Sequence, residues 1–543
     1  MNFVKDAARI LRPINLAISV LVLQLLAPAS LSLAQSPKSK DASNALFASE
    51  KIMDLQIRIA EKDIAEINRD ERPYVPAELV ENGQVVYRDF AIKLKGAAGS
   101  FRMFEDRPAL TIKTNRTNKD LAFHGLVKFH LNNSVQDESY LNEYICASIF
   151  ASTEYPTTRV TFARLRLNDR DVGLYVLKEG FDTRFLARHF KSPWGNLYDG
   201  GFLQDIDAEL EKDDGDGPND RSDLQKLATA AKLSEPLDRW KAIEDLVSID
   251  HFLTFMALER MTSHWDGYCL QSNNYRLYFD SKSKKAIFLP HGMDQMFGDP
   301  GMQLWNHPNP LISKAVMQNN SWRQQYRKRV ELLLPKLEPQ QLWRKIDAVQ
   351  TRLQPVLQSI NRDQANHQAG QVVELKRRIA ERYANILIQL LEPDPTPMEI
   401  EIGNAVALMD WYPVVEAGQA ELAVVDQVHG KQVKAYKIQF TAEPPLVASW
   451  RKTILLGPGK YRCSAKTMLE NYQPAENEPE GIRLTSNLIA VESVQNNFDH
   501  WGKQSIEFEI EEDQCEVEVI VELRAAQGTA YFDVEAMKLE KLD

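Results

Sequence analysis

The segment HWDGYCLQSNNYRLYFDSKSKKAIFLPHGMDQMFGD, residues 264–299, carries the most information about fold and function. Residues 274–279 alternate between apolar and polar side chains, and residues 286–290 form a second, continuously apolar run. A polar, lysine-containing stretch at 280–284 separates the two runs. Two β-rich runs joined by a short polar connection predict a β-hairpin.

Three polar side chains flank this predicted hairpin. Asp266 precedes it, Asn274 opens its first strand and Asp294 follows its second strand. Because a hairpin brings its two ends together, we expect these side chains to converge. Carboxylate and amide oxygens suit Mg²⁺ or Mn²⁺ carrying phosphate, and phosphoryl-transfer enzymes use such groups to position a hydroxyl and neutralise developing charge. Capping of a helix end and of a turn is the alternative role for Asp266 and Asn274.

Composition limits the class of protein. A chain of 543 residues is expected to hold two or three domains, and its hydrophobic content of 44% is ordinary for globular proteins. The net charge of −11 argues against a dedicated nucleic-acid binder, which needs clustered Lys and Arg for phosphate contacts.

The N-terminus has the pattern of a secretory signal peptide. Basic residues precede an apolar stretch at 14–26, and small residues follow up to Ala34, where cleavage is expected. No later segment has the roughly 20 apolar residues that a membrane span requires. We therefore predict a signal peptide at 1–34, a mobile leader at 35–50 and a secreted or periplasmic mature protein without a transmembrane segment.

Strands and helices alternate over the next part of the chain. Strands are expected at 53–59, 90–95, 109–113, 127–131, 160–167 and 172–177, and helices at 138–151 and 183–190, capped by Asp137 and Asp182. The acidic, glycine-rich stretch Lys212–Asp220 is expected to be a solvated linker, because it lacks the alternating ligands and terminal Glu of a calcium loop. Helices are expected to dominate from there to Leu391, apart from the hairpin.

A proline-rich linker at 393–397 marks a domain boundary. Strand-like segments follow at 398–402, 432–440, 461–468, 504–510 and 516–523, which predicts a β-sandwich over 398–543. Trp411, Tyr412 and Trp501 are expected to be exposed there, where they could form a sugar-binding platform or simply pack. Cys463 and Cys515 could pair as a disulfide in an oxidising compartment, although spacing does not settle connectivity.

Several segments of residues 50–390 together resemble the CotH kinase-like family, an atypical branch of the protein-kinase fold. These segments read IKLKGAAGSFRMFEDRPALTIK, GLVKFHLNNSVQDESYLNEYI, VGLYVLKEGFDTRFLARHF, WGNLYDGG, HWDGYCLQSNNYRLYFD and FLPHGMDQMFGD. The resemblance implies an α+β chain with an atypical protein-kinase-like catalytic domain at 51–392, followed by the all-β sandwich. It also implies transfer of phosphate from ATP, with Mg²⁺ or Mn²⁺, to a Ser or Thr hydroxyl of a protein whose identity the sequence does not give.

The resemblance assigns roles to individual residues. Asp266 matches the catalytic acid of the family, and Asn274 and Asp294 match its metal ligands. On the cofactor side, Lys95 begins a Gly-Ala-Ala-Gly-Ser loop that could approach phosphate, although a plain turn is equally consistent. Arg107 stands where the family generally has a lysine.

Three further positions match the family less specifically. Glu179 matches a family glutamate that could pair with a basic residue or a metal, with an ordinary salt bridge as the alternative. Asn132 and Asn133 match residues that could shape a nucleotide cleft, and a turn before the next helix is the alternative.

Two other readings compete with an exported kinase. In the first, the chain is a catalytically weak or inactive secreted scaffold whose β-domain recognises polysaccharide or a cell surface, which Arg107 and the appended domain favour. In the second, His264, Asp266, His291 and Asp294 form a metallohydrolase site, but the set lacks a third histidine.

Overall fold

The computed structural model describes residues 41–97, 99–114, 121–306, 308–393, 396–440, 446–474, 481–489, 493–495, 499–511 and 515–543. The predicted signal peptide and residues 35–40 of the predicted leader lie outside the described residues. The rest of the leader differs from the prediction, because Asn44–Ala48 form helix α1 and Leu46 is buried among the apolar side chains of the barrel interior. Arg159 donates hydrogen bonds to Ser43 and Asn44 and so holds this segment on the fold.

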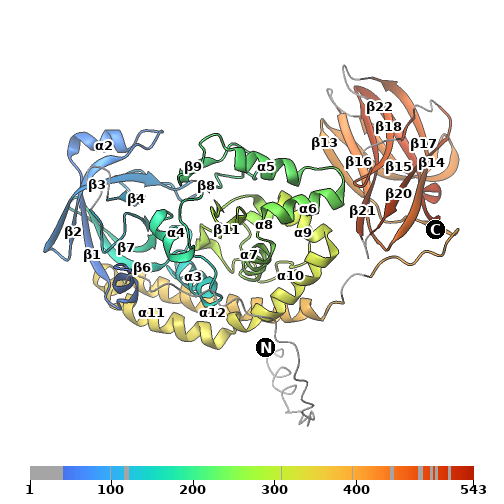
Figure 1. Cartoon of the computed structure of the whole chain (residues 1–543). Coiled ribbons are helices and arrows are strands. Elements are labelled where there is room, and N and C mark those ends of the chain that lie inside the picture. The colour runs from blue at the N-terminus through green and yellow to red at the C-terminus, as the bar shows by residue number, and fades with distance from the viewer. Residues whose placement is uncertain are drawn as a thin grey trace, which may run out of the picture. The chain divides into compact units, whose positions relative to one another are not determined.

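The first strands close into a barrel in the order β1-β2-β3-β4-β5-β7-β6 (Figure 1). Their bounds are Met53–Arg58, Val75–Glu81, Val85–Lys95, Ala109–Lys113, Lys128–Asn132, Val160–Leu167 and Arg170–Glu179 for β1 to β7. Helix α2 (Glu61–Ile67) lies between β1 and β2. The strands predicted here are confirmed to within a few residues, whereas β2, which contains a proline and two glutamates, was not predicted.

The two faces of the barrel wall differ in chemistry. Leu94, Leu110, Leu131 and Leu177 point into the apolar interior. Side chains alternate along each strand, so their neighbours in sequence point outward. The register places Thr111, His130 and Lys178 side by side on adjacent strands, which gives the outer face a polar row.

Helix α3 and a second sheet lie against this outer face. Helix α3 spans Asn142–Ser152, and the sheet has the order β11-β10-β8-β9. The strands are β8 (Leu197–Asp199), β9 (Glu211–Asp214), β10 (Tyr275–Phe279) and β11 (Ala286–Pro290). The hairpin prediction is confirmed, since β10 and β11 pair antiparallel from Tyr275↔Pro290 to Phe279↔Ala286.

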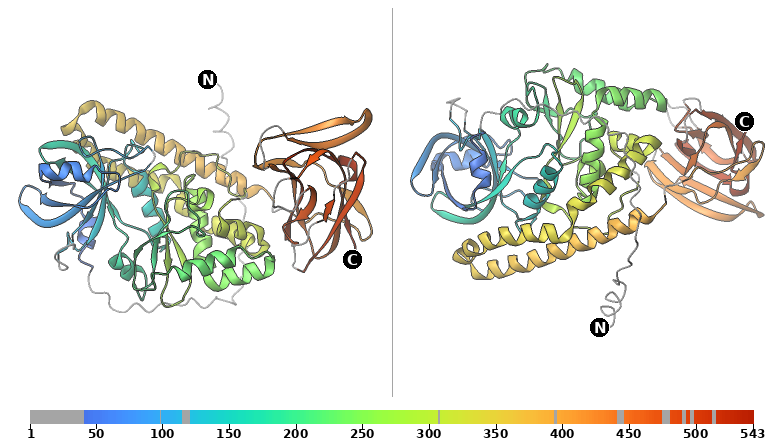
Figure 2. Two further views of the ribbon diagram at one scale, coloured as in Figure 1. Left: turned by 90° about the horizontal axis from the view of Figure 1, so that it is seen from above. Right: turned by 60° about the horizontal axis from the view of Figure 1, so that its bottom comes forward.

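Helices build the rest of this region. They are α4 (Thr183–His189), α5 (Ser222–Ala231), α6 (Pro236–Leu246), α7 (Ile249–Met261), α8 (Tyr268–Gln271), η2 (Met293–Gln295), α9 (Leu311–Gln318), α10 (Asn320–Leu333), η3 (Leu334–Leu337), α11 (Pro339–Ile360) and α12 (Arg362–Leu391). The long helices α11 and α12 run side by side in both views of Figure 2. Buried Arg382 of α12 donates to the carbonyls of Arg260 and Met261 and so ties this pair to the end of α7.

Two local predictions need correction and one is confirmed. The stretch Lys212–Asp220 is a solvated linker only in its second half, where Asp216 and residues 218–220 are exposed. Its first residues belong to β9, where Asp213 accepts two 2.7 Å bonds from Lys128. Helix α3 begins at Asn142 rather than 138, and Asp137 accepts from the Asn142 backbone N–H in the turn before it. Asp182 caps α4 as predicted, through the N–H groups of Arg184 and Phe185.

The C-terminal region is β-rich and antiparallel. Its strands are β12 (Ala405–Ala407), β13 (Tyr412–Ala417), β14 (Ala420–Val428), β15 (Lys431–Phe440), β16 (Leu446–Leu456), β17 (Gly459–Gln473), β18 (Gly481–Ser486), β19 (Ser493–Gln495), β20 (Gly502–Ile510), β21 (Cys515–Ala525), β22 (Gln527–Asp533) and β23 (Lys538–Lys541), with η4 at Val534–Ala536. One sheet has the order β12-β23-β17-β22-β15-β14, with β20 on β17, and the other has the order β13-β16-β21-β18-β19. Tyr436 and Trp450, one from each sheet, lie with ring centroids 4.7 Å apart.

Several expectations for this region change. Trp411 is buried and donates to the Leu408 carbonyl, so it belongs to no exposed platform, whereas Tyr412 is exposed and Trp501 is half-buried beneath Lys466. Cys463 and Cys515 are thiols on strands of different sheets. The segment 398–402 is not a strand, and residues 394 and 395 of the predicted linker lie outside the described residues.

Candidate functional site

A tight turn between α7 and α8 presents Asp266. Buried Glu259 of α7 holds the turn by accepting from the N–H groups of Tyr268 and Cys269 at 3.3 and 2.9 Å. Asn273 Nδ2 donates to one carboxylate oxygen of Asp266 at 2.8 Å, and Asn274 Nδ2 donates to the other at 2.9 Å. Two neutral donors fix the carboxylate while leaving each oxygen able to accept another hydrogen bond.

The Asn274 amide is itself closely fitted. Its nitrogen also donates to the Asp266 carbonyl at 2.9 Å, so its Oδ1 points away from Asp266. Gly292 lies against that oxygen with φ +57°, and a Cβ built on Gly292 would come within 2.2 Å of it. Glycine is therefore required at this position both by backbone conformation and by space.

Asp294 lies in η2, two residues beyond Gly292. Asn142, at the start of α3, donates to the Asp294 carbonyl at 2.8 Å and so joins the helix to this segment. Burial and the neighbouring Glu143 raise the pKa of the Asp294 carboxyl. Within the described residues no Lys, Arg or His nitrogen lies within 4 Å of this carboxylate, so an added cation would stabilise its charged form.

A buried ion pair that the sequence did not reveal lies beside Asp294. Lys178 of β7 pairs with Glu143 of α3, and the exposed fractions of the two side chains are 0% and 2%. Asn132 of β5 donates to the other Glu143 oxygen. Burial alone would raise the pKa of Glu143, but Lys178 and Lys95 outweigh it and hold the pKa below its ordinary value.

Lys95 joins the same cluster from β3. Its ammonium donates to Asn132 Oδ1 at 3.0 Å. Burial lowers its pKa to about 8, against the opposing effect of Glu143. The structure therefore places Lys95 and Asp294 in one cluster with Lys178 and Glu143.

Two histidines line the cluster in their neutral form. His130 shares a hydrogen bond with Thr111 at 3.0 Å, and His291 Nδ1 lies 3.4 Å from Lys178 Nζ. Burial and nearby cations hold both pKa values well below the ordinary range. Among the residues that the structure describes, no group of three or more His, Cys, Asp or Glu side chains is placed to hold a metal ion.

Arg107 has a packing role in the structure. Its guanidinium donates to Tyr140 Oη at 2.8 Å and to the Leu174 carbonyl at 2.6 Å, and it lies over the rings of Tyr140 and Tyr175. These contacts hold the guanidinium against the barrel wall rather than in the Lys95 cluster.

Glu179 is likewise structural. It pairs with Arg159 and Arg188, and its side chain is 5% exposed. Since Glu179 follows Lys178 on β7, it points to the opposite face of the strand. The structure therefore shows the alternative role given for Glu179, a salt bridge, although the carboxylate is buried rather than at the surface.

The side-chain amide of Asn133 helps to hold the glycine loop after Lys95. Asn133 Nδ2 donates to the carbonyls of Ser100 and Arg107 at 3.0 and 2.9 Å. Gly96 adopts φ +117°, and residue 98 of the loop lies outside the described residues. Asn133 therefore shapes the loop, while Asn132 belongs to the Glu143 cluster.

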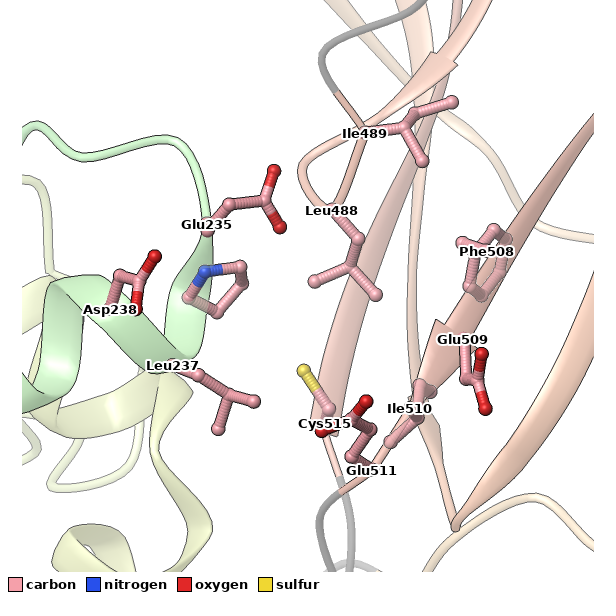
Figure 3. A pocket seen from close by; sticks show the side chains of 11 residues that line it. Glu235, Leu237, Asp238, Leu488, Ile489, Phe508, Glu509, Ile510, Glu511 and Cys515 are labelled. Carbon is pink, nitrogen blue, oxygen red and sulfur yellow. The ribbon is translucent and has the colours of Figure 1, made fainter.

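A separate pocket opens elsewhere, lined by the start of α6 and by residues of the β-rich region (Figure 3). Its charged side chains are Glu235, Asp238, Glu509 and Glu511. All four are acidic, so the lining shown does not suit an anionic nucleotide.

The comparison with protein families identifies the chain. The family described as CotH kinase protein matches residues 92–386, more than half of the chain, and the chain belongs to this family. Invasin CotH7 of Rhizopus delemar is 26% identical over 184 residues, covering 31% of each chain. Inner spore coat protein H of Bacillus subtilis is 23% identical over 193 residues, covering 32% of this chain and 51% of that protein.

The alignments thus span between about a third and a half of these relatives' lengths. Among solved structures, TmCBM61 in complex with β-1,4-galactotriose is similar at 16% identity over 24% of this chain and 88% of that chain, with a TM-score of 0.18. A TM-score this low supports no argument about fold or function. In the described part of the chain, no helix is long and apolar enough to span a membrane.

Proposed function

We propose that this protein is an exported phosphotransferase that moves phosphate from ATP, with Mg²⁺ or Mn²⁺, to a Ser or Thr hydroxyl of a protein. The observation that carries the proposal is the buried pair between Lys178 of a strand and Glu143 of a helix, next to the half-buried carboxylate of Asp294. A strand lysine paired with a helix glutamate, beside a metal-binding aspartate, is the arrangement on which protein kinases depend.

The two lysines of this cluster have different roles. Lys178 is fully buried, so it holds Glu143 and α3 in place and is a positioning residue. Lys95 is half-buried and keeps its ammonium at the edge of the cluster. With a pKa of about 8 it carries its charge at neutral pH, which suits contact with phosphate oxygens.

The oxygen atoms suit a hard cation. Asn274 Oδ1 is directed away from Asp266, and Asp294 has a pKa raised by burial that a cation would lower again. These two side chains would hold Mg²⁺ or Mn²⁺, which supplies neutralisation of charge on the transferred phosphate. Asp266, fixed by two amides, would accept the hydrogen bond of the acceptor hydroxyl and orient it.

The main argument for an inactive scaffold weakens once Arg107 is placed. That residue packs against tyrosines, and Lys95 and Lys178 supply the cations of the cluster. The arginine at position 107 therefore does not leave the proposed site without a cation to contact phosphate. Names such as spore coat protein and invasin among the relatives support a location outside the cytoplasm, in agreement with the signal-peptide pattern.

Titration calorimetry on the mature chain tests the proposal. ATP should bind only with Mg²⁺ or Mn²⁺, and Asp294→Asn should abolish that binding. Asp299→Asn is the matched control, because Asp299 is an exposed aspartate five residues further along. Asp266→Asn should keep ATP binding and lose transfer of ³²P to protein. Nucleotide binding that ignores the metal, or no binding at all, would refute the proposal.

A further inference from the structure

Large apolar side chains are exposed on the turn that carries Asp266 and on the loop at residues 200–205. Trp265, its neighbour in sequence, is 44% exposed, and Phe202 and Leu203 are 55% and 54% exposed. Solvated apolar side chains that gather at one place on a protein mark a binding surface more often than chance exposure does. We call these three residues the apolar platform.

Hydrogen bonds tie the two loops of the platform together. Tyr268, two residues after Asp266, donates to Asp205 at 3.0 Å. Tyr275, which follows Asn274, donates to the Gln204 carbonyl at 2.9 Å and accepts from the Gly200 N–H at its own carbonyl at 3.1 Å. Both ends of the loop that carries Phe202 and Leu203 are thus hydrogen-bonded to Tyr268 and Tyr275, which lie close in sequence to Asp266 and Asn274.

The conformation of this loop is costly. Leu203 has φ +53°, the left-handed region that bulky residues avoid at a cost of roughly 1–2 kcal/mol. Burial does not repay this cost, because the side chain is half in solvent. Strain that is retained on an exposed apolar residue is a feature of binding and active sites.

We propose that the apolar platform receives a large apolar side chain of the acceptor polypeptide, close in sequence to the Ser or Thr that Asp266 orients. The inference rests on the proposed phosphotransfer and names its acceptor more narrowly. A polypeptide fits better than a saccharide because the platform is apolar and includes the aliphatic side chain of Leu203, which an apolar side chain would bury better than the hydroxyl-bearing face of a sugar.

The test uses the full mature chain with ATP and Mg²⁺ and two serine peptides that differ at flanking positions, leucine in one and alanine in the other. Wild-type protein should prefer the leucine peptide by roughly tenfold or more in kcat/KM, the effect of burying a few methylene groups. Trp265→Ala and Phe202→Ala should bring this ratio toward one. Trp194→Ala is the matched control and should leave the ratio intact, because Trp194 is 55% exposed but lies next to Gly195, at the Phe279 end of β10.

Fluorescence anisotropy of the labelled peptides gives a second readout that needs no transfer, and the same preference and the same losses are expected. Equal use of the two peptides, or an unchanged ratio in both platform variants, would overturn the inference and leave the phosphotransfer standing. Transfer to a saccharide with refusal of both peptides would also overturn it. Loss of ATP binding altogether would instead refute the proposed function, and peptide anisotropy would still decide whether the platform binds.

Discussion

Removing Lys178 should expose how strongly the buried ion pair holds the cluster. In Lys178→Met an apolar chain of similar length replaces the ammonium, and Glu143 remains as a buried carboxylate without its main cation. Breaking one partner of a buried pair typically costs about 3–5 kcal/mol of unfolding free energy. Because both side chains are almost fully buried, solvent screening does not reduce this figure appreciably.

The cost should depend on pH in a defined direction. Without Lys178, burial raises the pKa of Glu143, because burial already opposes the charged form in the native protein. The folded variant then binds a proton more readily than the unfolded chain does, so its deficit relative to wild type shrinks as pH falls and is largest above neutral pH. Urea denaturation of both proteins at pH 5.5, 7.0 and 8.5 measures this difference.

Two controls separate charge from packing. Lys178→Met combined with Glu143→Gln removes both charges and keeps an oxygen for Asn132, so it should recover most of the lost free energy. Lys282→Met changes an exposed lysine and should cost under about 0.5 kcal/mol. A cost below about 1 kcal/mol for Lys178→Met at pH 8.5, or a cost that does not vary with pH, would refute the assigned pair.

Three further outcomes follow from local geometry. Asp182→Asn keeps the α4 cap but removes the ionisable group, whose pKa burial raises to about 6. Wild type should therefore lose unfolding free energy relative to the variant as pH rises from about 4 to 6. Calorimetric melting measures this difference, and a difference that stays constant with pH would contradict it. Gly292→Ala should lower the unfolding free energy by about 1 kcal/mol more than Gly430→Ala does, as denaturant unfolding would show. Both glycines have positive φ, but only at Gly292 would the new Cβ meet a neighbouring atom within 4 Å. Because that atom is Asn274 Oδ1, Gly292→Ala should also weaken metal-dependent ATP binding. Asp213→Ala should lower the unfolding free energy by about 1.5–3 kcal/mol, because its charged hydrogen bonds with Lys128 are lost. The control Asp216→Ala changes an exposed residue of the same segment and should alter the unfolding free energy little. Equal effects of the two substitutions would support a solvated linker at Asp213 as well.

The hairpin and most barrel strands could be predicted because alternation and turn residues act locally. Residues 286–290 were predicted to form a strand and do so, and Asp182 caps a helix as its side chain and position indicated. Local patterns fail where the reason for a structure lies far away in sequence. The acidic stretch after Glu211 looks solvated, but Asp213 folds onto Lys128, which lies 85 residues earlier in the chain.

The same distinction explains the candidate site. Asp266 and Asn274 are eight residues apart, and the short turn that contains α8 is enough to bring them together. Glu143 and Lys178 are 35 residues apart and meet only because a helix packs on the outer face of the barrel. No local signal in the sequence announces such a pair.

The alternation of side chains along β7 nevertheless indicates which of its charged residues belongs to the candidate site. Leu177 points into the barrel, so Lys178 must point outward, and Glu179 must point back to the inner side. The outer face is the one that also carries His130, and it is the one against which α3 lies. Of two adjacent charged residues in a strand, the one on the face shared with the other polar residues is therefore the better site candidate, and here that residue is Lys178 rather than Glu179.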